Sequence, residues 1–292
     1  MSRTQTARLM DGTALARRTV ARSAATAAEI TRRTGTAPCL ATVLVGDDPA
    51  SVTYVRMKRS RCEKAGIRSR QLALPATTTT AELVETLTGL SRDPEVHGIL
   101  LQHPVGPHID ERAAFEAIAP HKDVDGVTMR SFAAMSFGLP GFVSCTPGGI
   151  LRLLDEYDVD LAGKRAVVVG RSAILGKPVG MLLLARDATV TYCHSRTTDL
   201  ASVVSEADVL VAAVGRPRFL RGADIKPGAV VIDAGYHPGN VGDIDVDTAR
   251  ERAGLITPVP GGVGPMTIAV LLAQTVDAAM EQTAPGIALD AG

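Results

Sequence analysis

Apolar segments of strand length alternate with amphipathic segments along this chain, and that alternation limits its fold more than any other feature. Short apolar or alternating runs that predict strands lie at 39–46, 68–75 and 96–104. Segments with the spacing of helices lie at 12–34, 49–65, 80–91 and 110–120. Strands and helices that alternate in sequence usually form a parallel sheet, so the pattern predicts an α/β fold.

A second alternating series follows an irregular stretch. Residues 123–149 are rich in glycine and are expected to form a linker or a functional loop region. Beyond them, strands are expected at 164–170, 188–193, 208–215 and 228–235, with helices at 177–186 and 198–207. This order is typical of a dinucleotide-binding domain. A long apolar helix at 265–282 should pack against the body of the protein.

Length and charge narrow the class of protein. A chain of 292 residues is long enough for two domains or one large one. Its 31 basic and 31 acidic residues cancel, which argues against a general binder of nucleic acid or anionic membranes. The first twelve residues lack the apolar core of a signal peptide, and no run approaches the roughly 18–20 apolar residues of a membrane span. Four scattered cysteines without CxxC pairs suit reduced thiols, so a soluble cytoplasmic protein is expected.

The segment VVVGRSAILGKP, residues 167–178, can bind a phosphate. An expected strand ends at Gly170, Gly176 follows six residues later, and a helix begins at Lys177. Such a turn directs backbone N–H groups and a helix N-terminus at an anion. The segment matches neither GxGxxG nor a Walker A sequence, so a tight structural turn is an equal alternative.

The segment CHSRT, residues 193–197, follows the next expected strand. In a dinucleotide fold this strand end meets the adenosine ribose, and NAD enzymes usually place Asp or Glu there. Here the residues are His194, Ser195 and Arg196, so the carboxylate that would repel a 2′-phosphate is missing. An ordinary polar loop is the alternative.

Two further segments combine unusual composition with a position between expected elements. In KDVDG, residues 122–126, an extended backbone would direct the carboxylates of Asp123 and Asp125 to one side, where they can bind a cation or a ring edge. An Asx-turn before Gly126 is the alternative. TPVPGGVGPMT, residues 257–267, is either a ligand-contacting wall or a buried inter-domain turn.

The helix expected at 49–65 raises a question about one lysine. Asp48 suits its N-cap, and Gly66 suits the stop after its last turn. Tyr54 and Lys58 are four residues apart and therefore share one face. Because most lysines are solvated, a surface position for Lys58 is the ordinary interpretation.

Seven segments in collinear order resemble the bifunctional methylenetetrahydrofolate dehydrogenase/cyclohydrolase family. They are YVRMK, LLQHP, KDVDG, CTPGG, VVVGRS with GKP, ATVTYCHSRT and TPVPGGVGPMT, and the match covers roughly residues 10 to 280. The resemblance implies two α/β domains around a cleft: a folate-side catalytic domain at 1–146 and an NADP-binding Rossmann-like domain at 147–264. The helix at about 265–282 would pack back on the first domain. A cytoplasmic homodimer serving one-carbon metabolism and purine biosynthesis is also implied.

The resemblance also assigns roles to residues. Lys58 would be catalytic with Gln102 as its hydrogen-bond partner, and Tyr54 would stack on the tetrahydrofolate substrate. Asp125 would bind the pterin edge, while Gly262 and Pro265 would lie on the substrate side. No metal is implied. The residues implied to bind NADP, with Arg171 and Ser195 on its phosphate, are Gly170, Arg171, Ser172, Gly176, His194, Ser195, Thr197 and Gly215.

The chain departs from the family pattern at several positions around the implied folate site. The departures are His103, Val105-Gly106, Val127, Ser131, Ala133, Ser144 and Tyr236. They leave two alternatives open: a dehydrogenase with little cyclohydrolase activity or a shifted substrate, and a catalytically silent NADP- or folate-binding protein. The retained Lys58 and Gln102 weigh against both.

Overall fold

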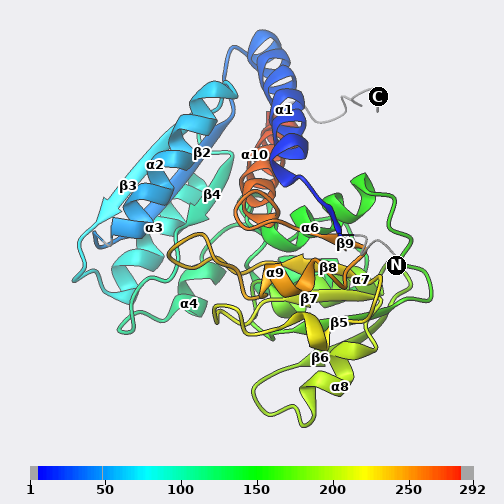
Figure 1. Cartoon of the computed structure of the whole chain (residues 1–292). Coiled ribbons are helices and arrows are strands. Elements are labelled where there is room, and N and C mark those ends of the chain that lie inside the picture. Colours follow the sequence, from blue (N-terminus) through cyan, green and yellow to red (C-terminus); the bar gives the residue numbers. More distant parts are fainter. Residues whose placement is uncertain (1–5, 48, 284–292) are drawn as a thin grey trace. The chain divides into compact units, whose positions relative to one another are not determined.

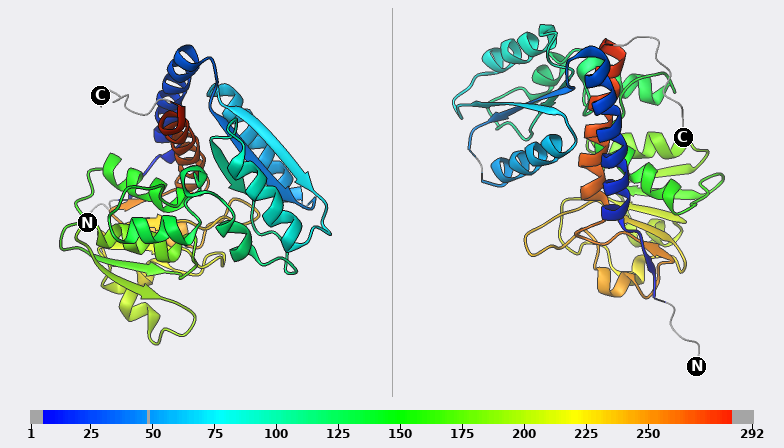
Figure 2. Two further views of the ribbon diagram at one scale, coloured as in Figure 1. Left: turned by 180° about the vertical axis from the view of Figure 1, so that it is seen from behind. Right: turned by 90° about the horizontal axis from the view of Figure 1, so that it is seen from above.

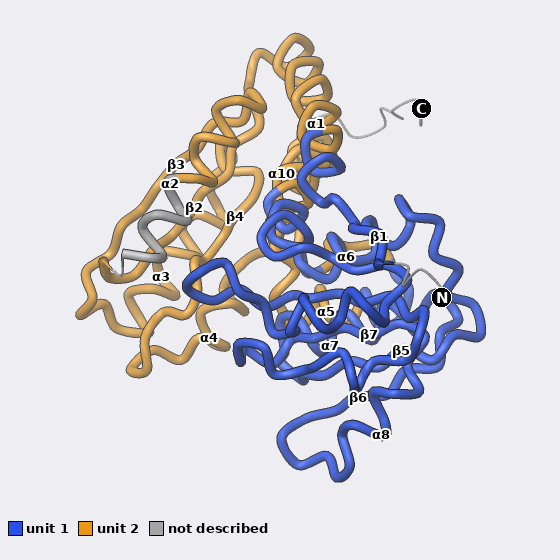
Figure 3. Tube along the Cα trace, in the orientation of Figure 1, with its two compact units in different colours: residues 1–17, 135–139, 144–268 blue, residues 18–134, 140–143, 269–292 orange. Residues whose placement is uncertain are grey.

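The computed structural model describes residues 6–47 and 49–283, with the backbone alone for 49–56. These residues form two compact units, coloured separately in Figure 3. Unit 1 contains the described residues up to 17 together with 135–139 and 144–268. Unit 2 contains 18–134, 140–143 and the described residues from 269 onward. Each unit is built on its own parallel sheet, so the predicted α/β fold with two domains is confirmed.

Unit 2 contains a parallel sheet of three strands in the order β3-β2-β4. These are β2 (Cys39–Val45), β3 (Arg68–Leu74) and β4 (Gly98–Leu101). β2 is buried over its first six residues because its sequence CLATVLV is almost continuously apolar, as suits a central parallel strand. β3 contains only half-buried and exposed residues, as suits an edge.

Helices cover both faces of this sheet. α2 (Pro49–Lys64) packs on β2 and β3, and α3 (Thr80–Arg92) packs on β4 from the opposite face (Figure 2). Gly66 ends α2 with φ 67°, as predicted, whereas the expected Asp48 cap lies outside the described residues. A capping box between Thr79 and Glu82 begins α3. The other early helical segments are α1 (Gly12–Thr34), α4 (Glu111–Glu116) and the 3-10 turn Pro120–Lys122.

Unit 1 contains six parallel strands in the order β1-β9-β8-β7-β5-β6. β5 lies between β6 and β7, so the strand order reverses at its two sides and creates the topological switch point where α/β sheets bind ligands. β1 and β9 were not predicted because two-residue strands carry no periodicity. The strands are β1 (Arg8–Leu9), β5 (Arg165–Val169), β6 (Thr189–Cys193), β7 (Val209–Ala212), β8 (Val230–Asp233) and β9 (Leu255–Ile256).

The glycine-rich stretch 123–149 is more regular than predicted. It contains α5 (Met129–Ser136) and the first residues of α6 (Cys145–Glu156). Gly148 and Gly149, two of the glycines in this stretch, lie inside α6, where Gly149 is needed for packing: a Cβ built there would lie 2.9 Å from Met266 Cβ. The remaining elements are α7 (Gly176–Leu184), α8 (Leu200–Ser205), the 3-10 turn Gly222–Asp224, α9 (Val246–Ala249) and α10 (Val263–Thr283).

From residue 269 onward, α10 belongs to unit 2. Gln274 Nε2 donates to the Val124 carbonyl at 2.8 Å. Gln282 Nε2 donates to the carbonyls of His97 at 2.9 Å and His121 at 3.1 Å. Among the described helices α10 alone has the length and apolar composition of a membrane span, and 67% of that apolar window is buried.

All four cysteines are buried as thiols. Burial raises the pKa of Cys62 to about 12, and it also raises the pKa values of Cys39 and Cys193. Because the thiolate is the reactive form, these side chains act as small apolar residues of the core.

The glycine at the start of β4 gives a test of packing in unit 2. A Cβ at Gly98 would lie 2.8 Å from Val124 Cγ2, and Val124 is fully buried. We therefore expect Gly98→Ala to lower the free energy of unfolding by about 1–3 kcal/mol in urea denaturation. Gly89→Ala in α3 is the matched control, because its Cβ would meet nothing within 4 Å, and it should stabilise by about 0.5–1 kcal/mol. Equal stability of the two variants would contradict this account.

Candidate functional site

Lys58 is buried and paired with a glutamine. Its side chain lies on α2 with 6% exposure, and Nζ donates to Gln102 Oε1 at 3.1 Å. Gln102 Nε2 donates to the His103 carbonyl at 3.0 Å, which turns Oε1 toward the lysine. The surface interpretation of Lys58 is therefore wrong, and the structure brings together two of the three residues expected to be catalytic. Tyr54 lies four residues earlier in α2, and its side chain is outside the described part of the chain.

The Lys58–Gln102 pair lies at the switch point of the small sheet. β2 pairs with β3 on one side and β4 on the other, and Gln102 directly follows β4. The Gln102 N–H donates to the Val43 carbonyl at 2.8 Å, so the glutamine continues the strand pairing. Ligands of open α/β sheets bind at such carboxyl ends. The His103 ring turns toward buried Phe115, with ring centroids 5.9 Å apart.

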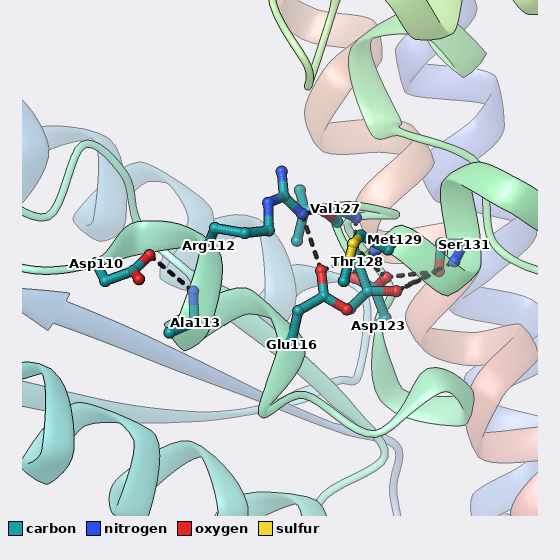
Figure 4. A network of polar contacts seen from close by, with 9 residues as sticks. All are labelled: Asp110, Arg112, Ala113, Glu116, Asp123, Val127, Thr128, Met129 and Ser131. Carbon is teal, nitrogen blue, oxygen red and sulfur yellow. Dashed lines mark hydrogen bonds and ion pairs between the residues drawn. The ribbon is translucent and has the colours of Figure 1, made fainter.

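The KDVDG segment forms a hydrogen-bonded turn rather than the expected extended segment (Figure 4). Asp123 is fully buried and accepts from the N–H groups of Val127 at 3.1 Å and Thr128 at 3.0 Å. Ser131 Oγ donates to the same carboxylate at 2.5 Å. Burial raises the pKa of Asp123, and these three hydrogen bonds oppose the rise. The turn before Gly126 is closed by the backbone, since the Gly126 N–H donates to the Asp123 carbonyl at 3.0 Å, and the Asp123 carboxylate bonds N–H groups beyond that glycine instead of forming the Asx-turn given as the alternative.

Asp125 has a different environment from Asp123. It is half-buried, and its carboxylate has no hydrogen-bond partner among the residues that the structure describes. Arg112 and Glu116 hold the far side of the turn: Arg112 donates to the Val127 carbonyl at 2.8 Å, and Glu116 accepts from the Met129 N–H at 2.9 Å. The turn is therefore rigid while its second carboxylate is available to a ligand.

In unit 1, two glycines allow the ends of three strands to meet. Gly170 follows β5 with φ 138°, and a Cβ there would lie 2.2 Å from the Ala213 carbonyl oxygen. Its N–H donates to the Cys193 carbonyl at 2.9 Å. A Cβ at Gly176 would lie 2.5 Å from the Gly170 carbonyl oxygen. Larger residues at either position would therefore push the loop away from the switch point.

Ser172 accepts hydrogen bonds from the N–H groups at the start of α7 that were expected to face a phosphate. Its Oγ accepts from the N–H groups of Leu175 at 3.2 Å and Gly176 at 3.1 Å, and its carbonyl accepts from Lys177 at 3.0 Å. The start of α7 is thus capped from within the chain. The backbone N–H groups of residues 171–174 find no acceptor among the described residues, so these donors are available to an anion. Arg171 is exposed on this loop.

The turn after β6 is ordered by its own side chains. Thr197 Oγ1 accepts from the His194 N–H at 2.8 Å, and His194 Nδ1 accepts from the Arg196 N–H at 3.2 Å. Ser195 and Arg196 are exposed at its tip. His194 and Thr197 therefore shape the turn, and the tip residues are available to a ligand.

Gly262 and Pro265 lie at the start of α10 in unit 1. Gly262 is buried, its N–H donates to the Pro258 carbonyl at 2.8 Å, and a Cβ there would lie 2.7 Å from that oxygen. Pro265 is half-buried in the first turn of the helix. The structure gives Gly262 a packing role, and contact of either residue with substrate stays a prediction.

Two buried aspartates near the end of β8 were missed by the sequence analysis. Asp243 is fully buried and Asp233 is 3% exposed, and both accept backbone N–H groups. The Gly-Asp pair at 242–243 was the available sign of a turn with a special residue, but the residues that bond the Asp243 carboxylate are distant in sequence. Within the described chain, no group of three or more His, Cys, Asp or Glu side chains is arranged to hold a metal ion.

Comparison with known proteins identifies relatives across both units. Two family models match the chain: the catalytic domain of tetrahydrofolate dehydrogenase/cyclohydrolase over residues 10–125, and its NAD(P)-binding domain over residues 144–283. The chain is 83% identical over 282 residues to bifunctional protein FolD 1 of Streptomyces avermitilis, covering 97% of this chain and 98% of that protein.

Solved structures of similar proteins match nearly the whole chain. The bifunctional enzyme FolD from Campylobacter jejuni is 40% identical with a TM-score of 0.92, covering 94% of this chain and 99% of that one. The methylenetetrahydrofolate dehydrogenase-cyclohydrolase of Trypanosoma brucei, complexed with NADP cofactor and inhibitor, is 38% identical with a TM-score of 0.90. It covers 94% of this chain and 98% of that one.

Asp233 gives a prediction for pH dependence. Burial raises its pKa from 3.8 to about 6, although three backbone N–H groups oppose the shift. The folded protein therefore binds this proton more tightly than the unfolded chain does. The contribution of Asp233 to stability is fully present below about pH 4 and is lost as pH rises to about 6.

The measurement is urea denaturation of the natural protein and of Asp233→Asn at several pH values. The free energy of unfolding of the natural protein, minus that of the variant, should fall by about 2–3 kcal/mol between pH 4 and pH 6. A difference that stays constant or rises over this interval would show that the carboxyl does not titrate there.

Proposed function

Because the chain belongs to the tetrahydrofolate dehydrogenase/cyclohydrolase family, we propose that it carries out two successive reactions of a folate. It oxidises 5,10-methylenetetrahydrofolate to 5,10-methenyltetrahydrofolate with NADP⁺, and it hydrolyses the product to 10-formyltetrahydrofolate. The observation that carries the proposal is the buried Lys58, whose Nζ lies 3.1 Å from Gln102 Oε1 at the carboxyl end of β4. A lysine placed at a ligand-binding edge and held by an amide is suited to proton exchange.

The hydrolytic step needs a group that takes a proton. Water adds to the methenyl carbon and must lose a proton, after which the ring C–N bond breaks and the nitrogen gains one. Lys58 Nζ is the group proposed to exchange these protons, and Gln102 fixes its position. The Gln102 amide is itself fixed by its bond to the His103 carbonyl, so the pair is preorganised.

Folate recognition is assigned to Asp125, with Tyr54 proposed to stack on the flat heterocycle. The aminopyrimidine edge of a pterin presents two N–H donors, which one carboxylate accepts together. Asp125 suits this role because the turn around it is held by Asp123, Arg112 and Glu116, while its own carboxylate has no partner among the described residues. Gly262 and Pro265 are proposed to line the substrate side.

The residues after β5 and β6 fit NADP. NADP⁺ held there would supply the acceptor for the hydride that leaves the methylene carbon of the folate. The N–H groups of residues 171–174 and the Ser172 hydroxyl can hold the diphosphate, and Gly170 and Gly176 keep that loop close to the sheet. Arg171 and Ser195 are proposed to bind the 2′-phosphate, within a set completed by His194, Thr197 and Gly215. No acidic residue stands between 194 and 198 to repel that phosphate.

The proposal includes the assembly and setting of the enzyme. We place the folate-side function in unit 2 and the NADP-binding function in unit 1. The division expected at 1–146 and 147–264 differs from these units chiefly because residues 6–17 and 135–139 belong to unit 1. Membership of the family supports a homodimer that works in the cytoplasm in one-carbon metabolism, including purine biosynthesis.

The decisive assay uses purified protein, 5,10-methylenetetrahydrofolate and NADP⁺. Absorbance should show NADPH formation without accumulation of the methenyl compound. Lys58→Met should lower the hydrolysis of added methenyltetrahydrofolate by about 10²–10⁴-fold, because it removes a general acid–base group.

The same samples supply the control. Lys58→Met should keep its circular dichroism and its affinity for NADP⁺, because Lys58 lies in unit 2. NADPH with an equal amount of methenyl product would indicate a dehydrogenase alone, and no NADPH would indicate a silent binding protein. A loss under about threefold in Lys58→Met would remove Lys58 from the catalytic role.

Cofactor choice is tested at Arg171. A guanidinium on a phosphate contributes a charge-assisted hydrogen bond, so Arg171→Ala should raise the KM for NADP⁺ by about ten- to a hundredfold. The weak reaction with NAD⁺ should stay nearly unchanged, because NAD⁺ lacks the 2′-phosphate. If the natural protein uses NAD⁺ as efficiently as NADP⁺, Arg171 and Ser195 do not recognise the 2′-phosphate.

A further inference from the structure

We infer that Asp243 is a positioning residue for the dinucleotide: its carboxylate fixes the loop 214–216, and thereby the affinity of unit 1 for NADP⁺. The inference rests on the proposed function and goes beyond it. Asp243 is not among the residues expected to touch the cofactor, and it acts through the backbone of a neighbouring loop.

The Asp243 carboxylate accepts hydrogen bonds from three successive backbone N–H groups. Its Oδ2 accepts from the N–H groups of Val214 at 2.6 Å and Gly215 at 2.9 Å, and Oδ1 accepts from Arg216 at 3.0 Å. The side chain is fully buried. Hydrogen bonds to a carboxylate withdrawn from water are stronger than neutral ones, so the loop has one strongly favoured conformation.

The loop fixed in this way lies at the switch point. It follows β7, which pairs with β5 along the side opposite β6. Ala213, the residue just before it, donates its N–H to the Val169 carbonyl at 2.8 Å, and its own carbonyl is the group against which Gly170 packs. The loop 214–216 therefore adjoins the residues proposed to hold NADP.

The outer face of the same loop is open. Gly215 and Arg216 are exposed, whereas their N–H groups are directed inward to Asp243. Gly215 has φ 66°, and a Cβ built there would meet nothing within 4 Å. A ligand can therefore rest on this face without competing for the hydrogen bonds that hold the loop.

A second buried carboxylate holds Asp243 itself. Asp233 accepts from the N–H groups of Asp243, Ile244 and Gly235, each at 2.9 Å. Each carboxylate also packs against a glycine whose position leaves no room for a side chain. A Cβ at Gly235 would lie 2.4 Å from Asp243 Cγ, and one at Gly242 would lie 2.0 Å from Asp233 Oδ2.

One side chain completes the environment of Asp243. His237 Nε2 lies 2.8 Å from Oδ1. His237 belongs to a short hairpin after β8, in which it pairs with Val241. A buried carboxylate is costly unless its oxygens are paired, and here six backbone N–H groups and one histidine nitrogen surround two acids beside the proposed cofactor loop. A loop that only had to connect two elements would need no such arrangement.

The experiment measures NADP⁺ binding directly by titration calorimetry. Asp243→Asn keeps the shape of the side chain but replaces one acceptor oxygen by a donor that faces backbone N–H groups. Its Kd for NADP⁺ should rise by about tenfold or more, while the KM for the folate changes less than about twofold. His237→Ala removes a single contact and should raise the Kd by about two- to fivefold.

Asp123→Asn is the matched control. Asp123 is also fully buried and also accepts backbone N–H groups, but it lies in unit 2. It should weaken folate binding and leave the Kd for NADP⁺ unchanged. An equal loss of NADP⁺ affinity in Asp123→Asn and Asp243→Asn would mean a general effect of destabilisation and would overturn the inference.

Folding of each variant is checked by circular dichroism before binding is measured. A folded Asp243→Asn protein with the natural Kd for NADP⁺ overturns the inference. If that variant does not fold, His237→Ala decides: a raised Kd supports the inference and an unchanged Kd overturns it. Natural protein that fails to bind NADP⁺ at all would refute the proposed function instead, so the two failures are distinguishable.

Discussion

In each unit, the two strands that follow a central parallel strand along the chain pair with opposite sides of it. This strand order decides where a ligand can bind. β2 lies between β3 and β4, and β5 lies between β6 and β7. The chain therefore leaves the carboxyl ends of neighbouring strands in opposite directions, which opens that edge to ligands. Lys58 and Gln102 meet at one such edge, and the loop that begins at Gly170 lies at the other.

Each unit also has a loop that is held by a buried carboxylate. Asp123 fixes the turn that carries Asp125, and Asp243 fixes the loop after β7. A buried acid is unfavourable unless backbone or side-chain donors surround it, so each of these loops loses several hydrogen bonds at once if its acid is removed. The loops therefore keep a defined shape although they lie outside regular secondary structure.

The sequence predicted the elements whose signal is local. Periodicity identified β2, β5 and α3, and a glycine marked the end of α2 at Gly66. It failed where a residue is chosen by a distant neighbour: Gly149 belongs to the glycine-rich stretch expected to be a loop but lies inside α6, where a Cβ would come within 2.9 Å of Met266 Cβ. Asp243 was missed because its partners at 214–216 lie 27 to 29 residues earlier. Lys58 was identified only through the family resemblance, since helical spacing alone could not show that it is buried.

The buried thiols have a consequence for work on the enzyme in solution. Alkylating reagents and oxidants attack thiolates, and burial suppresses ionisation of Cys39, Cys62 and Cys193. Cys39 and Cys62 belong to unit 2 and Cys193 to unit 1. The native protein should therefore tolerate air and thiol-directed labels, and any modification that does occur records a transient opening. The position of the modified cysteine then tells which of the two units opened first.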